Sequence, residues 1–121
     1  MNNYKQLEAW KAAMELVTNI YQLTKVYPKE EMYALTSQTK RAAVSVAANI
    51  AEGLGRQYKK DTIQFLHIAR GSLYEVETLL LIAKNTTVLP EEKFNEIETQ
   101  WLKTIQLLNG FINYFEKADL K

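Results

Sequence analysis

The chain has 121 residues, of which 47% are hydrophobic, and its 15 basic and 14 acidic side chains leave a net charge of +1 at neutral pH. We expect one domain, residues 1–121, and the balanced charge excludes a global electrostatic attraction to nucleic acid or to an anionic membrane. The absence of cysteine excludes disulfides and thiolate metal sites and is compatible with a reducing cytoplasm.

No run reaches the roughly 18 apolar residues that span a membrane, and the N-terminus lacks the apolar segment of a signal peptide. These features predict a soluble, cytoplasmic protein with no membrane segment. The charge is nevertheless uneven, because residues 32–61 contain five basic and two acidic side chains, a net charge of +3. An anionic partner would therefore be attracted to the middle of the chain.

Residues 4–27 have apolar side chains at spacings of three and four, which predicts the first helix. The main stripe consists of Leu7, Trp10, Met14, Val17 and Tyr21. Pro28 ends this helix, because proline lacks a backbone donor and disfavours helical geometry in the residue before it.

The second helix is predicted over about residues 33–53, and it has two distinct faces. Its polar face has side chains at spacings of four, four, three and four, namely Arg41, Ser45, Asn49, Glu52 and Arg56. Its other face consists of alanine, valine and isoleucine, whose short side chains let other backbones approach closely. We therefore expect this helix to be central and contacted on most sides. We expect Gly53 and Gly55 to end it through the left-handed conformation open to glycine.

The third helix is predicted over residues 62–84 and the fourth over about residues 90–117. Gly71 and Ser72 are consecutive small residues in the third helix, and we expect them to face the small residues of the second helix. No segment has the alternating pattern of a strand.

Four helices of similar length with short connections predict an all-α fold, an antiparallel up-down-up-down four-helix bundle. The first and fourth helices have more apolar residues than one stripe requires, and Leu102, Leu107 and Phe111 lie off the main stripe of the fourth. This excess predicts self-association, because a helix of a monomeric bundle needs only one apolar stripe.

Several motifs point to a known family. They are residues 41–46 (RAAVSV), 49–53 (NIAEG), 55–56 (GR), 65–66 (FL) and 69–73 (ARGSL), together with Trp10, Tyr27-Pro28 and Leu35-Thr36. In these motifs the chain resembles the four helix bundle proteins encoded in intervening sequences of bacterial 23S rRNA genes, and the resemblance covers nearly the whole chain. The accessory protein of diversity-generating retroelements looks like a more distant relative.

The resemblance implies a four-helix bundle that assembles as a ring, commonly a homopentamer, and it suggests association with nucleic acid. The chain departs from the family at Ala47, where a small residue and often proline is usual, and at Tyr58, where serine is usual. Alanine at position 47 should leave the second helix straighter. Since Tyr58 offers no serine-type cap, we expect Asp61, paired with Gln64 as a capping box, to start or reinforce the third helix.

The polar face of the second helix allows two interpretations. In one, Arg41, Ser45, Asn49 and Glu52 form a structural network. Glu52 would then pair with Arg56 or Arg41, and Asn49 would bond a neighbouring helix, since half-buried charges are normally paired. In the other, one or both arginines face a phosphate of a ligand.

The connector between the second and third helices, residues 54–60, is the main candidate for a nucleic-acid site. Three cations and one aromatic ring within five residues could hold a phosphodiester backbone and stack a base. The candidate nucleic-acid-binding residues are Arg41, Arg56, Tyr58, Lys59 and Lys60. The alternative is a solvated turn, although a symmetric oligomer would repeat the patch and let many weak charges act together.

Nothing in the sequence predicts catalysis, a metal site or a cofactor. His67 is the only histidine, and it has no cysteine or carboxylate partner at ligand spacing on its helix face. The chain contains no P-loop, no G-x-S-x-G motif and no Glu-x-x-His repeat. We therefore expect a protein that is not an enzyme.

Two functions fit these observations. The first is a non-enzymatic oligomer associated with RNA, or with DNA, through the basic connector. The second is a scaffold or adaptor that binds no nucleic acid and docks a protein partner on the apolar excess of the first and fourth helices. Trp101 and Phe111 would be the positions to test on that docking surface.

Overall fold

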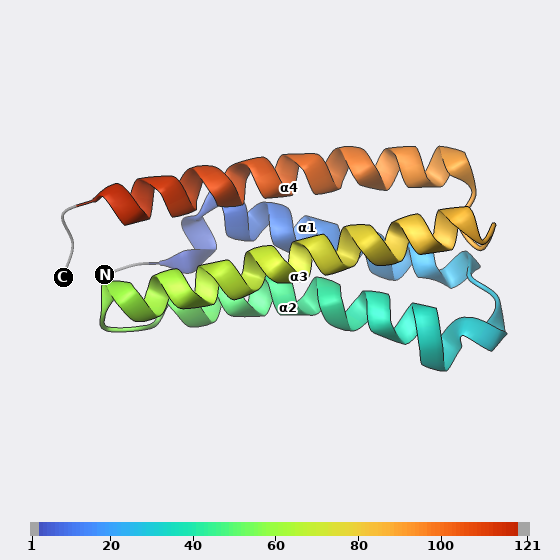
Figure 1. The fold of residues 1–121 in the computed structure, drawn as a ribbon, viewed down its shortest axis with the longest axis horizontal. Coiled ribbons are helices and arrows are strands. Elements are labelled where there is room, and N and C mark those ends of the chain that lie inside the picture. Colours follow the sequence, from blue (N-terminus) through green and yellow to red (C-terminus); the bar gives the residue numbers. More distant parts are fainter. Residues whose placement is uncertain (1–2, 119–121) are drawn as a thin grey trace.

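A computed structural model describes residues 3–118, in which the backbone is helical almost throughout (Figure 1). The long helices are α1 (Glu8–Leu23), α2 (Ser37–Leu54), α3 (Lys59–Asn85) and α4 (Glu91–Lys117). Short 3-10 turns lie at Tyr4–Gln6, Thr24–Val26 and Lys29–Glu31, and a π turn lies at Met32–Thr36. No strand occurs between residues 3 and 118, so the all-α class is confirmed.

The helices form a bundle in which α1 packs on α2 and α4, and α3 packs on the same two helices. The colours in Figure 1 run in opposite directions along successive helices. In agreement with this arrangement, Lys59 at the start of α3 donates hydrogen bonds to the carbonyls of Glu116 and Ala118 at the end of α4. The predicted four-helix bundle is confirmed, and its short connections place consecutive helices antiparallel.

The first two helices are shorter than predicted because other turns replace their ends. Pro28 follows α1 in an extended conformation, as expected, but the 3-10 turn Thr24–Val26 separates it from the end of α1. The π turn Met32–Thr36 precedes α2, so the regular helix begins only at Ser37. A π turn has a wider hydrogen-bonding ring than an α-helix, and such turns are frequent at functional sites.

The third helix begins at Lys59, three residues before the predicted start, with Tyr58 as its extended N-cap residue. Asp61 lies inside the first turn, and no side chain caps the helix, so the predicted capping box is wrong. A tertiary contact decides the start instead. The hydroxyl of Thr62 donates a hydrogen bond to the carbonyl of Gly53 over 2.7 Å and ties the first turn of α3 to the end of α2.

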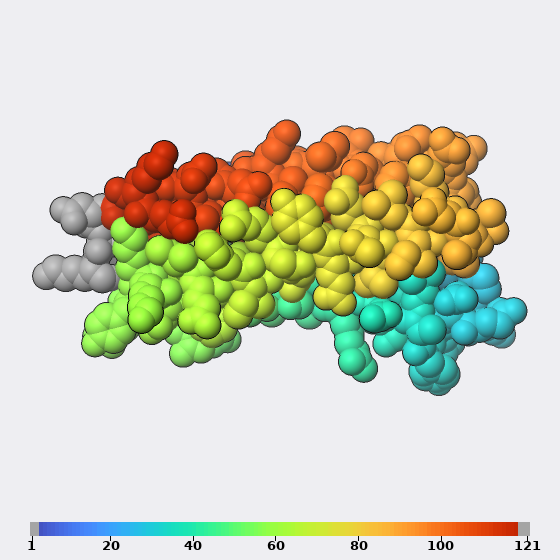
Figure 2. All heavy atoms as spheres, viewed as in Figure 1, coloured from blue at the N-terminus to red at the C-terminus, as the bar shows by residue number. Residues whose placement is uncertain are grey.

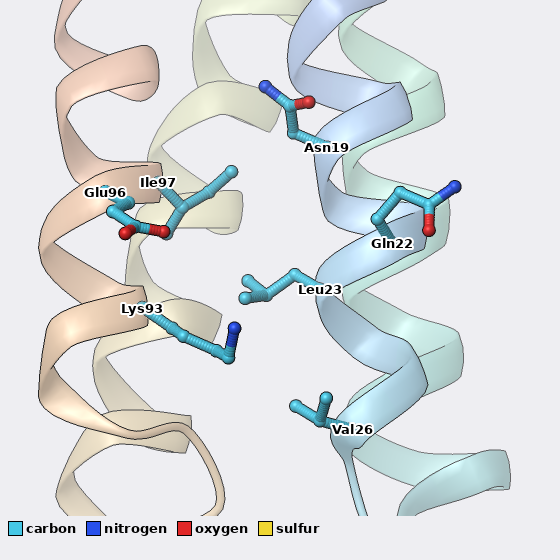
Figure 3. Close-up of a pocket in the computed structure, with 7 residues that line it drawn as sticks. All are labelled: Asn19, Gln22, Leu23, Val26, Lys93, Glu96 and Ile97. Carbon is cyan, nitrogen blue, oxygen red and sulfur yellow. The ribbon is translucent and has the colours of Figure 1, made fainter.

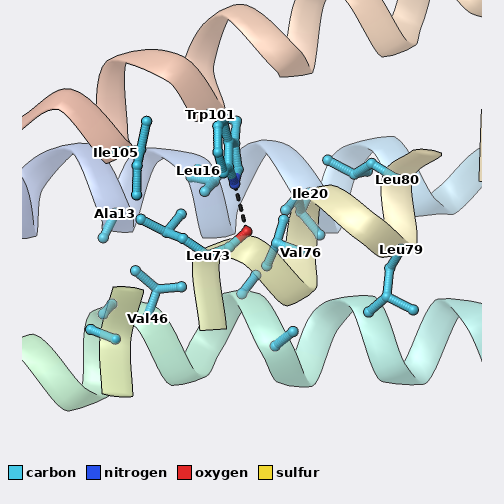
Figure 4. Packing of buried hydrophobic residues seen from close by; sticks show 14 of the residues in the cluster. Ala13, Leu16, Ile20, Val46, Leu73, Val76, Leu79, Leu80, Trp101 and Ile105 are labelled. Atoms are coloured by element: carbon cyan, nitrogen blue, oxygen red, sulfur yellow. Dashed lines mark hydrogen bonds between the residues drawn. The ribbon is translucent and has the colours of Figure 1, made fainter. Parts of the chain in front are cut away.

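Aliphatic side chains from all four helices fill the centre of the bundle (Figure 4). The largest fully buried ones are Leu16, Ile20, Val46, Ile50, Leu66, Leu73, Val76, Leu80, Leu89 and Leu108. Trp101 joins them from α4 with only 4% of its surface exposed, and its indole Nε1 donates a hydrogen bond to the carbonyl of Leu73 over 2.6 Å. Trp101 is therefore a core residue, and it is not available as a test position on a docking surface.

The glycines at the end of α2 act differently from the prediction. Among residues 3–118 no glycine has a positive φ, and Gly55 stays near helical geometry with a φ of −85°. Gly53 is buried, and a Cβ added there would lie 2.9 Å from the Cβ of Phe65. Gly53 is therefore required because α2 and α3 approach each other closely, and not because a left-handed residue ends the helix.

The prediction that Gly71 and Ser72 face the small residues of α2 is confirmed only in part. The hydroxyl of Ser72 lies 2.9 Å from the hydroxyl of Ser45 on α2, which is the contact that was expected. Gly71 is exposed, and a Cβ added there would meet no atom within 4 Å. The small size of Gly71 therefore serves no packing purpose inside the described chain.

The outward face of α2 is open in the single chain, so α2 is not contacted on most sides within one bundle. Arg41, Val44, Ala48 and Glu52 are all exposed, because a four-helix bundle gives each helix only two close neighbours. The small residues of α2 on this side are uncovered in the single chain.

Candidate nucleic-acid interface

The polar face of α2 divides into separate groups in the structure. Ser45 and Asn49 form one of them, with Asn49 Nδ2 donating hydrogen bonds to the carbonyl and the hydroxyl of Ser45 over 2.8 and 2.9 Å. The Ser45 hydroxyl also shares a hydrogen bond with the hydroxyl of Ser72 on α3. These three half-buried side chains link α2 to α3 and satisfy one another, which is the requirement for polar groups at a helix contact.

Glu52 and Arg56 form the second group at the end of α2. The Arg56 Nη2 and Glu52 Oε2 atoms are 2.7 Å apart, and both side chains are exposed. The Arg56 guanidinium also lies over the ring of Phe65, 4.6 Å from its centre. An exposed ion pair of this kind contributes little to stability, but the ring and the carboxylate together hold Arg56 in one place.

Lys59 has a structural partner. Its Nζ atom donates hydrogen bonds to the carbonyls of Glu116 and Ala118, over 2.9 and 2.7 Å. The last carbonyls of a helix have no partner within the helix and carry partial negative charge, so a lysine there is favourable. Lys59 therefore caps α4, and its charge is largely committed to that helix end.

Tyr58 and Lys60 are the connector residues that remain open to solvent. Tyr58 is 58% exposed, and Lys60 is exposed close to it in the first turn of α3. In the part of the chain that the structure describes, Lys60 has no acidic partner. Together with Arg56 they form a surface of two cations and one aromatic ring at one end of the bundle.

Arg41 does not join this surface. Fifteen residues separate it from Arg56, which corresponds to roughly 20 Å along a helix. Arg41 instead lines a groove of about 670 Å³ beside the start of α2. We call it the α2 groove; it is lined by Tyr21, Met32, Tyr33, Thr36, Ser37, Lys40, Arg41, Val44 and Ser45.

Sequence reasoning missed Tyr33 and Lys40 as partners of Arg41. A signal for one of them was present, because Tyr33, Ser37 and Arg41 recur at a spacing of four and so share one helix face. These three residues also line a smaller hollow of about 160 Å³. Tyr33 and Arg41 therefore form a ridge between the α2 groove and this smaller hollow.

Another hollow, of about 340 Å³, lies between α1 and α2 and is largely apolar. We call it the α1–α2 hollow; it is lined by Tyr4, Trp10, Met14, Val17, Val44, Ala47, Ala48 and Ala51. It shares Val44 with the α2 groove, so the two adjoin on one side of the bundle. None of its lining residues is charged.

The opposite side of the bundle differs in character, because polar side chains connect α3 to α4 there. Arg70 Nη1 donates a hydrogen bond to Asn109 Oδ1 over 3.0 Å, and His67 Nε2 lies 3.3 Å from Glu116 Oε2. Figure 2 shows this face, on which the side chains of α3 and α4 meet along the length of the two helices. Polar side chains therefore bridge the α3–α4 side, whereas the α1–α2 side has the apolar α1–α2 hollow and the α2 groove.

A hollow of about 350 Å³ lies where the end of α1 faces the start of α4 (Figure 3). Figure 3 shows Leu23 and Lys93 extending toward each other across it. It contains one cation and one carboxylate, from Lys93 and Glu96, and none of the predicted site residues. It is therefore not part of the candidate interface.

The model of the family described as 23S rRNA-intervening sequence protein matches residues 5–110. The chain belongs to this family. This confirms the resemblance that was inferred from the motifs of α2 and α3.

A solved structure supports the same assignment for this intervening-sequence protein. It is the crystal structure of a protein with unknown function from the S23 ribosomal protein family of Bacteroides thetaiotaomicron. The two chains are 25% identical, the match covers 86% of this chain and 97% of the other, and the TM-score is 0.79. No curated protein matches the chain.

Other kinds of site have no support in the described part of this intervening-sequence protein. Between residues 3 and 118, no three histidine or carboxylate side chains come together in a way that would hold a metal ion. Over the same residues, no helix combines the length and the hydropathy that a membrane span requires.

One carboxyl group of this protein has a strongly shifted pKa. The pKa of Glu98 on α4 is raised from 4.5 to about 7, first by burial and then by a hydrogen bond and charge repulsion from Glu77 on α3, while Lys84 acts in the opposite direction. The Oε1 atom of Glu98 is buried and has no hydrogen-bond partner among residues 3–118. A partly buried carboxyl group beside a second carboxylate is less stable when both are ionised.

We expect the stability of the bundle to fall as the pH rises from 4.5 to 7. The folded state holds a proton on Glu98 that the unfolded chain releases at lower pH, so deprotonation weakens the folded state. Glu98→Gln should remove this dependence and raise Tm by a few degrees at pH 8. Thermal unfolding followed by circular dichroism at pH 5 and pH 8 measures the effect. Glu96→Gln on the exposed side of α4 is the control, and an equal response of both variants would contradict the assignment.

Proposed function

We propose that this protein is a non-enzymatic, RNA-associated oligomer that works in the cytoplasm. The observation that carries the proposal is the exposed surface of Arg56, Tyr58 and Lys60, which we call the connector surface. It lies in the one segment of the chain with a clear excess of positive charge. The family description refers to an intervening sequence of 23S rRNA, which favours RNA over DNA as the partner.

The connector surface has the chemistry that contact with an RNA backbone requires. Lys60 offers an ammonium group without an acidic partner in the described chain. Arg56 presents an exposed guanidinium that is held between the Phe65 ring and the Glu52 carboxylate. Cations of this kind bind phosphates by releasing counterions, and an exposed tyrosine stacks an unpaired base. Lys59 supports the surface indirectly, because it joins the first turn of α3 to the end of α4.

The α1–α2 hollow supports the proposal that copies of the chain associate with one another. It is apolar, it is lined by small residues of α2 and by Trp10 and Met14 of α1, and nothing in the described chain covers it. A second copy is the occupant that we propose, and the family resemblance suggests a homopentamer. Each added copy would repeat the connector surface, so that contacts too weak for one subunit would act together.

The test is a charge reversal confined to the connector surface. Arg56→Glu combined with Lys60→Glu should weaken binding of a labelled, structured RNA by at least tenfold. The variant should also lower the slope of log affinity against log salt by about one for each phosphate that it no longer binds. Lys59 stays unchanged, because its replacement would also uncap α4. Fluorescence anisotropy across a salt series measures binding, and light scattering on the same samples measures the mass.

Lys25→Glu combined with Lys103→Glu is the matched control, since both lysines are exposed and lie away from the connector. The control should bind RNA like the unaltered protein, and circular dichroism should show the same helical content in both variants. Binding by the connector variant with an unchanged salt slope would contradict the proposal.

A scaffold or adaptor is the second candidate, and the α1–α2 hollow is the observation that favours it. A protein partner of apolar character could occupy that hollow in place of a second copy. On α4, Leu102 is exposed and offers such a partner a further apolar contact. A well-formed protein that binds no RNA even at low salt, and that binds a defined protein partner, would favour this function over the first.

A further inference from the structure

The α2 groove combines features that the connector surface lacks. It is the largest of the hollows described above, with a volume of about 670 Å³, and its lining includes two cations and no acidic residue. Lys40 Nζ lies 4.7 Å above the centre of the Tyr21 ring, which holds that cation beside the groove. Arg41 is exposed and, among residues 3–118, makes no ion pair. The groove therefore attracts an anion.

An aromatic ring stands at the edge of this cationic groove. Tyr33 is 92% exposed, the largest exposure among the large hydrophobic residues of the described chain. Burial of this ring against a ligand would be favourable, because tyrosine combines a large apolar surface with a polar hydroxyl. The backbone places it there, since Tyr33 belongs to the π turn Met32–Thr36 that lifts this segment away from regular helix.

Hydroxyl groups complete the lining. Thr36 and Ser37 contribute hydroxyl groups to the lining beside Arg41. A ligand that fits has a flat ring, a negative charge within reach of two cations, and several polar atoms. An unpaired nucleotide has this combination, because its base stacks on aromatic rings, its phosphate binds cations and its sugar hydroxyl both donates and accepts hydrogen bonds.

We propose that the α2 groove is a second RNA-binding site, which binds an unpaired nucleotide with the base against Tyr33 and the phosphate between Lys40 and Arg41. This inference rests on the proposed function and extends it. The connector surface holds the RNA backbone at one end of α2, and the groove holds an unpaired base roughly 20 Å away. RNA with single-stranded segments is therefore preferred over continuous duplex.

The experiment compares a fluorescein-labelled decauridylate with a labelled RNA duplex of ten base pairs. Tyr33→Ala should weaken binding of the single strand about tenfold and change binding of the duplex by less than twofold, since only unpaired bases stack on protein rings. Tyr33→Phe should bind like the unaltered protein, because it keeps the ring. Arg41→Ala should lower the salt slope by about one for each groove that is occupied.

Tyr114→Ala is the matched control, because this tyrosine is 67% exposed on α4 and lies outside the groove. It should leave both affinities unchanged. Light scattering should give the same mass for Tyr33→Ala as for the unaltered protein. A smaller assembly would overturn the proposal, since Tyr33 would then be a contact between subunits.

The outcomes separate this inference from the proposed function. Duplex binding by the unaltered protein, with equal single-strand affinity in Tyr33→Ala and the control, would overturn the groove assignment and leave the connector surface intact. Absence of binding to both RNAs by the unaltered protein would overturn the proposed function and the groove assignment together.

Discussion

Replacement of Trp101 by alanine is expected to lower the free energy of unfolding by about 4 kcal/mol, the usual range for removal of a buried tryptophan being roughly 3–5 kcal/mol. Trp101 is 4% exposed and packs among the aliphatic residues of the core. Its Nε1 donates to the carbonyl of Leu73 on the facing helix, over 2.6 Å. The substitution therefore leaves a cavity and removes a hydrogen bond between α3 and α4.

Urea unfolding followed by circular dichroism measures this effect, at one fixed protein concentration because self-association would otherwise alter the apparent stability. Trp101→Phe should be less destabilising, since it keeps an aromatic ring in the core but not the hydrogen bond. Trp10→Ala is the control at the surface, because Trp10 is only half-buried and its replacement should cost about 1–2 kcal/mol. A destabilisation below about 1 kcal/mol for Trp101→Ala would contradict the core position of this residue.

Gly53→Ala is expected to destabilise the bundle by about 1–3 kcal/mol, the usual cost of overpacking. The added Cβ would lie 2.9 Å from the Cβ of Phe65 and 3.2 Å from the carbonyl oxygen of Thr62. Neither atom is the end of a flexible side chain, so α2 and α3 must move apart to make room. This expected destabilisation is opposite in sign to the effect of helix propensity, since alanine is about 1 kcal/mol more favourable than glycine within a helix.

Gly71→Ala is the matched control for Gly53→Ala. A Cβ at position 71 meets no atom within 4 Å, so helix propensity alone should act and stabilise the chain by about 0.5–1 kcal/mol. Thermal and urea unfolding of the two variants under the same conditions compares them directly. Equal effects of the two substitutions would mean that close packing of α2 on α3 does not decide the role of Gly53.

The long helices were predictable because the signals that specify them are local. Apolar residues at spacings of three and four identify a helix without knowledge of its neighbours, and Pro28 and Pro90 mark two of the boundaries. The short connections then predicted the bundle. The motifs of α2 and α3 identified the family, since their residues are read directly from the chain.

The candidate interface residues show which contacts cannot be predicted from neighbouring residues in the sequence. Arg41, Arg56 and Lys59 are similar cations in the sequence, yet the first lines a groove, the second pairs with Glu52, and the third caps α4. The Lys59 partners are 57 and 59 positions away in the chain. No spacing rule within one helix can reveal contacts over such separations.

Helix periodicity and local charge are properties of consecutive residues, so they were enough to predict a four-helix bundle with one basic segment. Contacts between helices, in contrast, show which cations are committed to structural partners and which surfaces stay open. The hydrogen bond from Thr62 to Gly53, the α2 groove and the α1–α2 hollow all arise where segments distant in sequence meet. Packing between helices decides such features, since the free energy of each contact depends on atoms from two elements at once.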